Sequence, residues 1–272
     1  MNKLKYIKQL LLTAIVLLSV SACQWKWKMP DFNSESSDIK VMRYDRLEST
    51  YLTTADFSAL QQMSTDYPIE TRTLIENVLQ LGEMSDAEIN KKFLRLFQDS
   101  ALQTLISDVE AEYANMDDIN QQLTKSFKEL KKILPDIRIP VFYAQITALD
   151  QSIIIGDKSI GISLDKYMGQ NYPLYQRFYT KDQTEMMHRA AIVPDCLCFY
   201  LVSLYPMQDF DKQSQVSRDI YISRIQWVVN KVTKYNFFKG QYLSLIDENF
   251  DESDITIQEL LTTSNYNEPV PN

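Results

Sequence analysis

Two acidic residues in the middle of the chain lie where carboxyl groups could do acid–base chemistry. Asp165 follows an apolar, β-branched run and precedes Tyr167 by two residues, and Asp195 directly follows Pro194. A side chain at the end of a strand can project into a cleft, and two carboxyl groups in one pocket can act as general acid and general base. Aspartate is equally favoured as a helix cap. The sequence therefore offers Asp165, Tyr167 and Asp195 as a candidate pocket or as helix caps.

Metal chemistry is restricted by the histidine content. The chain has one histidine, His188, whereas an HExxH zinc site needs two histidines one helical turn apart. Glu185 lies three residues before His188, but two side chains do not complete a metal site, and a solvated helix face is the favoured interpretation. We predict no metal and no cofactor. A hydrolase or metal-dependent enzyme that uses Asp165, Asp195 or His188 is the alternative.

Cys23 is the residue whose chemistry the sequence defines best. It ends the run Val20-Ser21-Ala22-Cys23, after a short segment with three lysines and a mostly apolar stretch over residues 9–20. This arrangement resembles a bacterial lipobox, in which the cysteine thiol is diacylated before cleavage in front of it. The apolar stretch is shorter than the roughly 20 residues of a membrane-spanning helix. We predict a signal peptide at residues 1–22 and Cys23 as a lipid-bearing N terminus, carrying diacylglycerol and palmitate.

The residues after the cysteine fit a chain that leaves a membrane surface. Trp25, Lys26, Trp27 and Lys28 alternate aromatic and basic side chains, which favour the membrane–water interface. Polar residues without apolar periodicity follow as far as Asp38. We therefore predict a lipid-anchored tether at residues 23–38 and one folded domain at residues 39–272.

Net charge restricts the partners of that domain. The whole chain has 28 basic and 36 acidic residues, a net charge of -8. Removing residues 1–22 removes three lysines and no acidic residue, which leaves a net charge of about -11. Nucleic-acid binding needs a basic surface, so we expect no nucleic-acid partner. From residue 39 onward about 234 residues remain, enough for one domain with a sizeable core.

Apolar periodicity predicts helices in the first half of the chain. The spacing favours helices at residues 56–65 and 69–81, and Ser85 with Glu88 has the pattern of a capping box that opens a third helix. A further helix is expected at residues 101–114. A stripe at steps of three and four then predicts a long helix, through residues Ile119, Leu123, Phe127, Leu130 and Leu134.

The middle of the chain has the composition of strands. Three β-branched and aromatic runs lie at residues 139–147, 152–155 and 159–164, with a turn signal at Gly156-Asp157. Helices are expected again at residues 184–191, after Pro194, and at residues 217–237. The sequence therefore predicts an α+β fold, a predominantly helical single domain with a small antiparallel β-sheet in the middle.

The order of these segments resembles a known family. The blocks look like those of the gliding-motility lipoprotein GldB family of Bacteroidetes over roughly residues 39–206, and ISLDKYMG and IVPD are the most specific of them. Beyond residue 206 the similarity weakens, and the chain stops about where members of the family carry a further helix, so the resemblance implies a C-terminally shortened member. The matching blocks are VMRYDR (41–46), YPIETRTLIENVLQLG (67–82), LKKILPDIRIPVFYAQIT (130–147), IIIGDKSIGISLDKYMG (153–169), AIVPD (191–195) and LYP (204–206).

The resemblance carries implications of its own. Its members are outer-membrane or cell-envelope lipoproteins associated with gliding machinery, without an established catalytic activity, and the family is distantly similar to zincin-like scaffolds. It therefore implies a lipid-anchored, non-catalytic structural or interaction component with an envelope protein partner, on a scaffold that has lost any zincin metal site. Since Gln24 and the residues after it form no acidic run, we favour the periplasmic face of the outer membrane over the cell surface.

Overall fold

The structure is a computed structural model, and its described part runs from residue 38 to residue 271. The predicted signal peptide and nearly all of the tether, with Cys23, Trp25, Lys26, Trp27 and Lys28, lie outside the described residues. The predictions for these segments are therefore not tested by the fold.

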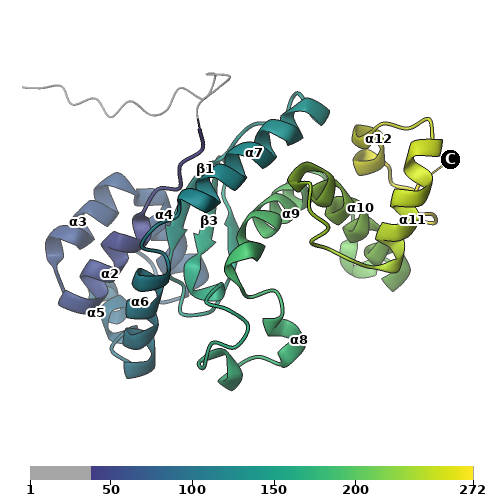
Figure 1. The fold of residues 1–272 in the computed structure, drawn as a ribbon. Helices are drawn as coiled ribbons and strands as arrows, with labels where there is room; N and C mark the ends of the chain where they lie inside the picture. Colours follow the sequence, from purple (N-terminus) through teal and green to yellow (C-terminus); the bar gives the residue numbers. More distant parts are fainter. Residues whose placement is uncertain (1–37, 272) are drawn as a thin grey trace, which may run out of the picture. The chain divides into compact units, whose positions relative to one another are not determined.

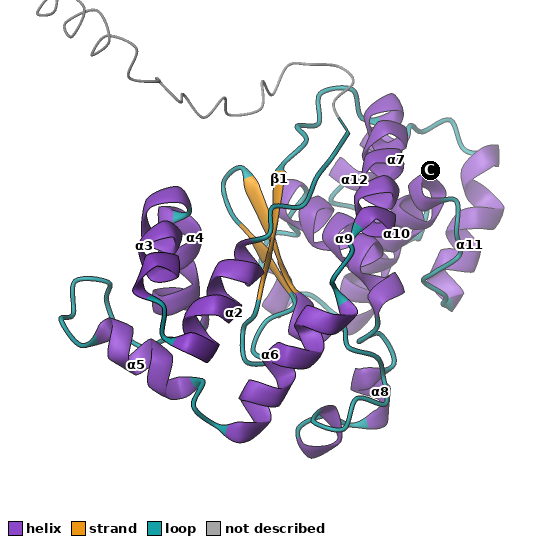
Figure 2. Ribbon diagram, turned by 60° about the vertical axis from the view of Figure 1, so that its left-hand side comes forward, coloured by secondary structure: helices purple, strands orange, loops and turns teal. Residues whose placement is uncertain are grey.

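A three-stranded sheet lies between two groups of helices (Figures 1 and 2). The strand order is β1-β3-β2, so the last strand of the three occupies the centre. A residue before the first helix, Met42, adds an isolated parallel bridge to Tyr143 of β1. The strands are β1 (Val141–Gln145), β2 (Ile153–Ile155) and β3 (Ser159–Ser163).

The helices of the first group precede the sheet in sequence and lie on one side of it (Figure 1). Side-chain caps define two of their starts, because Asp56 accepts from the Ser58 N–H and Asp99 from the N–H groups of Ala101 and Leu102. The group comprises α2 (Tyr44–Thr54), α3 (Phe57–Asp66), α4 (Pro68–Arg72), the π-helix η1 (Thr73–Val78), α5 (Ile89–Leu96) and α6 (Ser100–Glu112).

The second group lies on the opposite side of the sheet, with α9 in contact with β2 and β3 (Figure 2). Within residues 38–271, no helix is both long enough and apolar enough to cross a membrane. The helices of eight or more residues in this second group are α7 (Asp117–Ile133), α9 (Ile192–Leu204), α10 (Gln215–Thr233) and α11 (Gln241–Asn249). The shorter helical segments that follow β3 in the sequence are η2 (Leu164–Lys166), η3 (Tyr175–Arg177), α8 (Lys181–Thr184), η4 (Arg189–Ala191), η5 (Phe210–Lys212), η6 (Phe250–Glu252) and α12 (Ile257–Thr262).

The two faces of the sheet contact different helices, because successive side chains of a strand point to opposite faces. Phe142 packs its ring against Phe127 of α7, with centroids 5.4 Å apart. Tyr143, the next residue, packs against Tyr44 of α2 at 6.2 Å. Both helix groups therefore share one core with the sheet, which confirms the predicted α+β single domain. The similarity to a degenerate zincin-like scaffold stays a prediction.

The expected pairing of the strands is half right. β2 and β3 form the predicted antiparallel pair around the turn at Gly156-Asp157. β1, however, pairs with β3 in parallel, with Val141 opposite Ser159. β3 lies in the centre, so it pairs in parallel with β1 on one edge and antiparallel with β2 on the other. The sheet is therefore mixed, not antiparallel.

The sequence predicts the presence of most helices better than it predicts the residues at which they begin. The predicted capping box at Ser85 and Glu88 is wrong: α5 begins at Ile89, and the Ser85 hydroxyl donates to Glu83 instead. The expected helix at residues 184–191 is replaced by the short α8 and η4. Pro194 does not separate two helices but lies in the first turn of α9. The N–H groups of a first turn have no partner within the helix, so proline removes no helical hydrogen bond there.

Gly161 in β3 is required by the close approach of Tyr143. A Cβ atom at position 161 would lie 2.6 Å from the Tyr143 hydroxyl oxygen and 2.7 Å from its ring carbon Cζ. We predict that Gly161→Ala lowers the free energy of unfolding by about 2 kcal/mol or more, because the ring must leave its place between the sheet and α2. Urea unfolding of the full chain measures this.

The matched control is Gly240→Ala, where the new Cβ would lie 3.4 Å from Leu243 Cδ1. That variant should unfold within about 1 kcal/mol of the wild type. Equal stability of the two variants would contradict the packing described for Tyr143.

Candidate functional site

The loop that follows β1 has an unusual backbone. Ala148 and Leu149 have φ angles of 51° and 68°, two consecutive non-glycine residues in the left-handed region. This conformation is unfavourable by roughly 1–2 kcal/mol for each such residue. The loop therefore needs specific contacts to hold it, and two buried carboxyl groups supply them.

Asp165 provides the first set of contacts. It lies in η2 directly after β3, and it is fully buried. Its Oδ1 accepts from the Thr147 N–H at 3.1 Å and its Oδ2 from the Leu149 N–H at 2.6 Å. Burial raises the pKa of Asp165 to about 6, and these N–H donors counteract only part of that effect.

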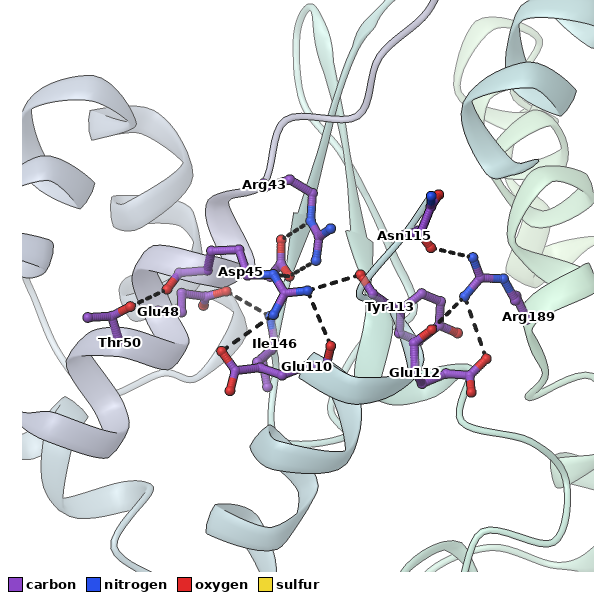
Figure 3. A network of polar contacts seen from close by, with 11 residues as sticks. Arg43, Asp45, Glu48, Thr50, Glu110, Glu112, Tyr113, Asn115, Ile146 and Arg189 are labelled. Carbon is purple, nitrogen blue, oxygen red and sulfur yellow. Dashed lines mark hydrogen bonds and ion pairs between the residues drawn. The ribbon is translucent and has the colours of Figure 1, made fainter. Parts of the chain in front are cut away.

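Glu48 of α2 provides the second set. Its Oε2 accepts from the Ile146 N–H at 2.8 Å (Figure 3), and the side chain has 0% exposure. Burial raises the pKa of Glu48 well above its usual value, and the charges of Asp45 and Asp165 raise it further. Burial therefore favours the protonated form of Glu48.

Glu48 belongs to a polar layer between α2 and the sheet, which we call the acid layer and which comprises Glu48, Ser49, Gln145 and Asp165. All four side chains are buried, and the Gln145 amide donates to Ser163 across the parallel strands at 3.4 Å. Among the described residues, Glu48 Oε1, Ser49 Oγ and Gln145 Oε1 have no hydrogen-bond partner. Unsatisfied buried polar atoms are infrequent in proteins, so the acid layer is the least satisfied part of this core.

Arginine side chains bind polar groups near Glu48 and at the C terminus of α6 (Figure 3). Arg43 donates to Asp45 at 2.7 Å, and Arg46 donates to the carbonyl oxygens of Glu110 and Tyr113 at the end of α6. On the other side, Arg189 donates to the carbonyl oxygens of Glu112 and Asn115 and pairs with Asp118 at 2.7 Å. The C terminus of α6 is therefore bound from two sides by guanidinium groups, which favour that end of the helix dipole.

A chain of tyrosine contacts leads from Asp165 toward the surface. The Tyr175 hydroxyl donates to the Asp165 carbonyl at 2.5 Å and accepts from the Met168 N–H at 2.9 Å. The Tyr113 hydroxyl donates to the Tyr167 carbonyl at 2.7 Å. The segment at residues 165–168 is therefore fixed at three of its backbone groups.

Asp195 is held separately from Asp165. The Tyr167 hydroxyl donates to its Oδ2 at 2.8 Å, and burial raises its pKa to about 6. Burial is also the main cause of the shift at Asp165, so a second carboxyl group is not what perturbs either residue. The helix-cap interpretation is wrong for both, since neither η2 nor α9 has a side-chain cap. Their carboxyl groups instead accept hydrogen bonds from residues that are distant in the sequence.

The segment ends at a shallow surface hollow of about 740 Å³. Tyr172 is bound there by its hydroxyl, which donates to Asp108 at 2.7 Å. Glu185 and His188 both line this hollow, although they do not share a helix as expected, because α8 ends at Thr184. The hollow is lined by Met168, Gly169, Gln170, Asn171, Tyr172, Glu185 and His188.

The side chains from residue 38 to residue 271 include no group of three or more histidine, cysteine, aspartate or glutamate residues placed to hold a metal ion. His188 lies against the ring of Phe237, with centroids 5.9 Å apart. The hollow therefore brings Glu185 and His188 together with amide side chains and a tyrosine, but not with Asp165 or Asp195.

Sequence reasoning selected Asp165, Tyr167 and Asp195 but missed Glu48. A signal was present, because Asp45, Glu48, Ser49 and Leu52 are spaced at three and four residues and are all buried along one stripe of α2. Polar residues in such a stripe are normally assigned to the exposed face of a helix.

Comparison with known proteins gives one match. A family model described as gliding motility protein GldB matches residues 26–236, which is more than half of the chain. The matched range includes α2, the loop after β1, the hollow and α10. No curated protein and no solved structure matches the chain.

Amide substitution of the two buried acids should change the free energy of unfolding by different amounts. Glu48→Gln keeps the oxygen that accepts from Ile146 and puts an amino group at the unpartnered position, so the free energy of unfolding should stay within about 1 kcal/mol of the wild type or increase. Asp165→Asn turns one of two accepting oxygens into a donor that faces an N–H group, and should lower it by about 2–3 kcal/mol. Urea unfolding at pH 7 measures both, and equal effects would contradict the contacts described.

Asp195 should make stability depend on pH. Its raised pKa means that the folded chain binds the proton more tightly than the unfolded chain, so this contribution is present below about pH 4 and is lost as pH rises to about 6. Asp195→Asn keeps an oxygen for the Tyr167 hydroxyl but does not titrate. The stability of the wild type relative to this variant should therefore fall by on the order of 2 kcal/mol from pH 4 to pH 6.

Chemical unfolding at a series of pH values gives this difference. Asp182→Asn, an exposed position on α8, is the control and should leave the pH profile unchanged. A wild-type profile parallel to that of Asp195→Asn would show that Asp195 has an ordinary pKa.

Proposed function

The chain belongs to the gliding motility protein GldB family, and from this membership we propose that it is a lipid-anchored cell-envelope protein that binds a protein partner and does not catalyse a reaction. The family assigns it to gliding-motility proteins of the envelope. The anchor, the membrane face and the absence of catalysis are the parts that we propose.

The anchor is Cys23, carrying a diacylglycerol and a palmitate. The tether at residues 23–38, with its Trp-Lys-Trp-Lys run, separates the membrane from the domain at residues 39–272. We place the chain on the periplasmic face of the outer membrane, because the residues after Cys23 form no acidic run. Several acyl chains bind a membrane stably, since each buried methylene adds about 0.8 kcal/mol.

One observation carries the non-catalytic role. Both carboxylate oxygens of Asp165, the best catalytic candidate in the sequence, accept from backbone N–H groups of the loop after β1. Asp195 is likewise engaged by Tyr167. A catalytic carboxyl group must reach substrate with a free oxygen, whereas both oxygens of Asp165 hold the backbone of the loop.

The hollow is the surface that we assign to the partner. Hydrogen bonds hold two residues of its rim in place. The Met168 N–H donates to the Tyr175 hydroxyl, and the Tyr172 hydroxyl donates to Asp108. Gln170 and Asn171 lie at its exposed edge with Glu185. A rigid, polar surface with amide groups suits hydrogen bonding to another protein better than it suits an apolar small molecule.

Cross-linking in intact cells tests the partner, and metal content tests the alternative of a metal-dependent enzyme. With a photo-reactive residue in place of Gln170 in the full chain, we expect a covalent adduct with another envelope protein. The same residue in place of Asp157, at the turn between β2 and β3, is the control and should give none. No adduct from Gln170, with one metal ion per wild-type chain that is lost in His188→Ala, would support the enzyme instead.

The anchor has its own test. Cells fed a palmitate analogue should label the wild type and not Cys23→Ala, and the variant should leave the membrane fraction. A labelled Cys23→Ala protein would contradict the anchor while leaving the binding proposal intact.

A further inference from the structure

The residues after α12 pack onto α10. Residues 264–271, which we call the strap, form neither helix nor strand and lie among α10, α11 and α12 at the end of the described chain (Figure 1). Val270 packs against the hydrophobic core and Pro271 is buried. The strap is therefore a bound segment of irregular structure.

A single buried side chain holds the backbone of the strap. Arg224 of α10 is 1% exposed, and its guanidinium donates to the carbonyl oxygens of Asn265 at 2.7 Å, Glu268 at 2.6 Å and Pro269 at 2.9 Å. Carbonyl oxygens are present in any peptide, so these contacts select a backbone shape and not a sequence.

An aromatic contact adds sequence selectivity. The ring of Tyr266 packs edge-on against Tyr221 of α10, with centroids 5.8 Å apart, and the Arg224 guanidinium lies 5.2 Å from its centre. Three residues later Pro269 supplies one of the bound carbonyl groups. The strap therefore presents an aromatic residue followed at the third position by proline.

The strap does not supply an acceptor for every nitrogen of the Arg224 guanidinium. Nη1 of this buried guanidinium has no hydrogen-bond partner among the described residues, and burial lowers the pKa of Arg224 to about 10. An unpartnered buried donor weakens binding. A peptide that offers one more acceptor to Nη1 would therefore bind this face better than the strap does.

We propose that the α10 face formed by Tyr221 and Arg224 is a docking site for an extended partner segment with an aromatic residue followed three positions later by proline, and that the strap occupies this site within the chain. This proposal rests on the partner-binding function and names a second contact. Such a segment can displace the strap, because Arg224 Nη1 has no partner in the strap and the other contacts of Arg224 are to backbone carbonyl groups that any peptide offers.

Competition with a free peptide tests the proposal on the full chain. A fluorescent peptide of residues 264–272 should bind the wild type weakly, because the tethered strap acts at high effective concentration. Tyr266→Ser weakens the strap and leaves the α10 face intact, so the peptide should bind this variant at least tenfold more tightly. Fluorescence anisotropy gives both dissociation constants.

Arg224→Lys added to Tyr266→Ser should abolish that binding, because lysine lacks the planar set of donors. Arg218→Lys, a change of the same kind at a partly exposed position on α10, should leave it intact. The docking site is refuted if Tyr266→Ser binds the peptide no better than the wild type does, or if Arg224→Lys does not reduce binding. If the double variant fails to fold by circular dichroism, the comparison of Tyr266→Ser with the wild type decides. An adduct from Gln170 is unaffected by either outcome.

Discussion

The left-handed backbone at Ala148 and Leu149 is the constraint on which the rest of this structure depends. The loop must turn sharply after β1 to let β2 form on the far edge of the sheet, and Glu48 and Asp165 bind it at three N–H groups. Glu48 comes from α2 and Asp165 from the end of β3. The same contacts that stabilise the turn therefore join the first helix group to the sheet. Because both acids are buried, their pKa values are raised, and the N–H groups that they accept from offset part of the free energy of burying them.

This arrangement links the core to the surface. Asp165 binds the loop through its carboxyl group and Tyr175 through its carbonyl group, and Tyr175 in turn binds Met168 at the rim of the hollow. Asp165 thus helps to position the rim of the hollow. Such a rim suits the proposed partner binding, since less entropy is lost on binding when the surface is already ordered.

The long helix and the hairpin, which are set by local spacing, were predicted from the sequence, whereas features set by distant contacts were not. The stripe from Ile119 to Leu134 predicted α7, and the β2–β3 hairpin followed from its turn residues. The parallel pairing of β1 with β3 was missed, because no local pattern shows which strand takes the centre. Asp165 does not cap a helix as predicted, since capping is a local rule and the N–H groups that its carboxylate accepts from lie 16 and 18 residues away. Glu48 was missed because its partner lies 98 residues away.

Amide hydrogen exchange at Ile146, Thr147 and Leu149, followed by NMR on the full chain, measures most directly whether the acids hold the loop. We predict that these three amides exchange as slowly as those of β1, although they lie in a loop, and that Asp165→Asn speeds exchange at Thr147 and Leu149 more than at Ile146. Exchange in the wild type at the rate of an open surface loop would show that the buried acids do not bind this backbone.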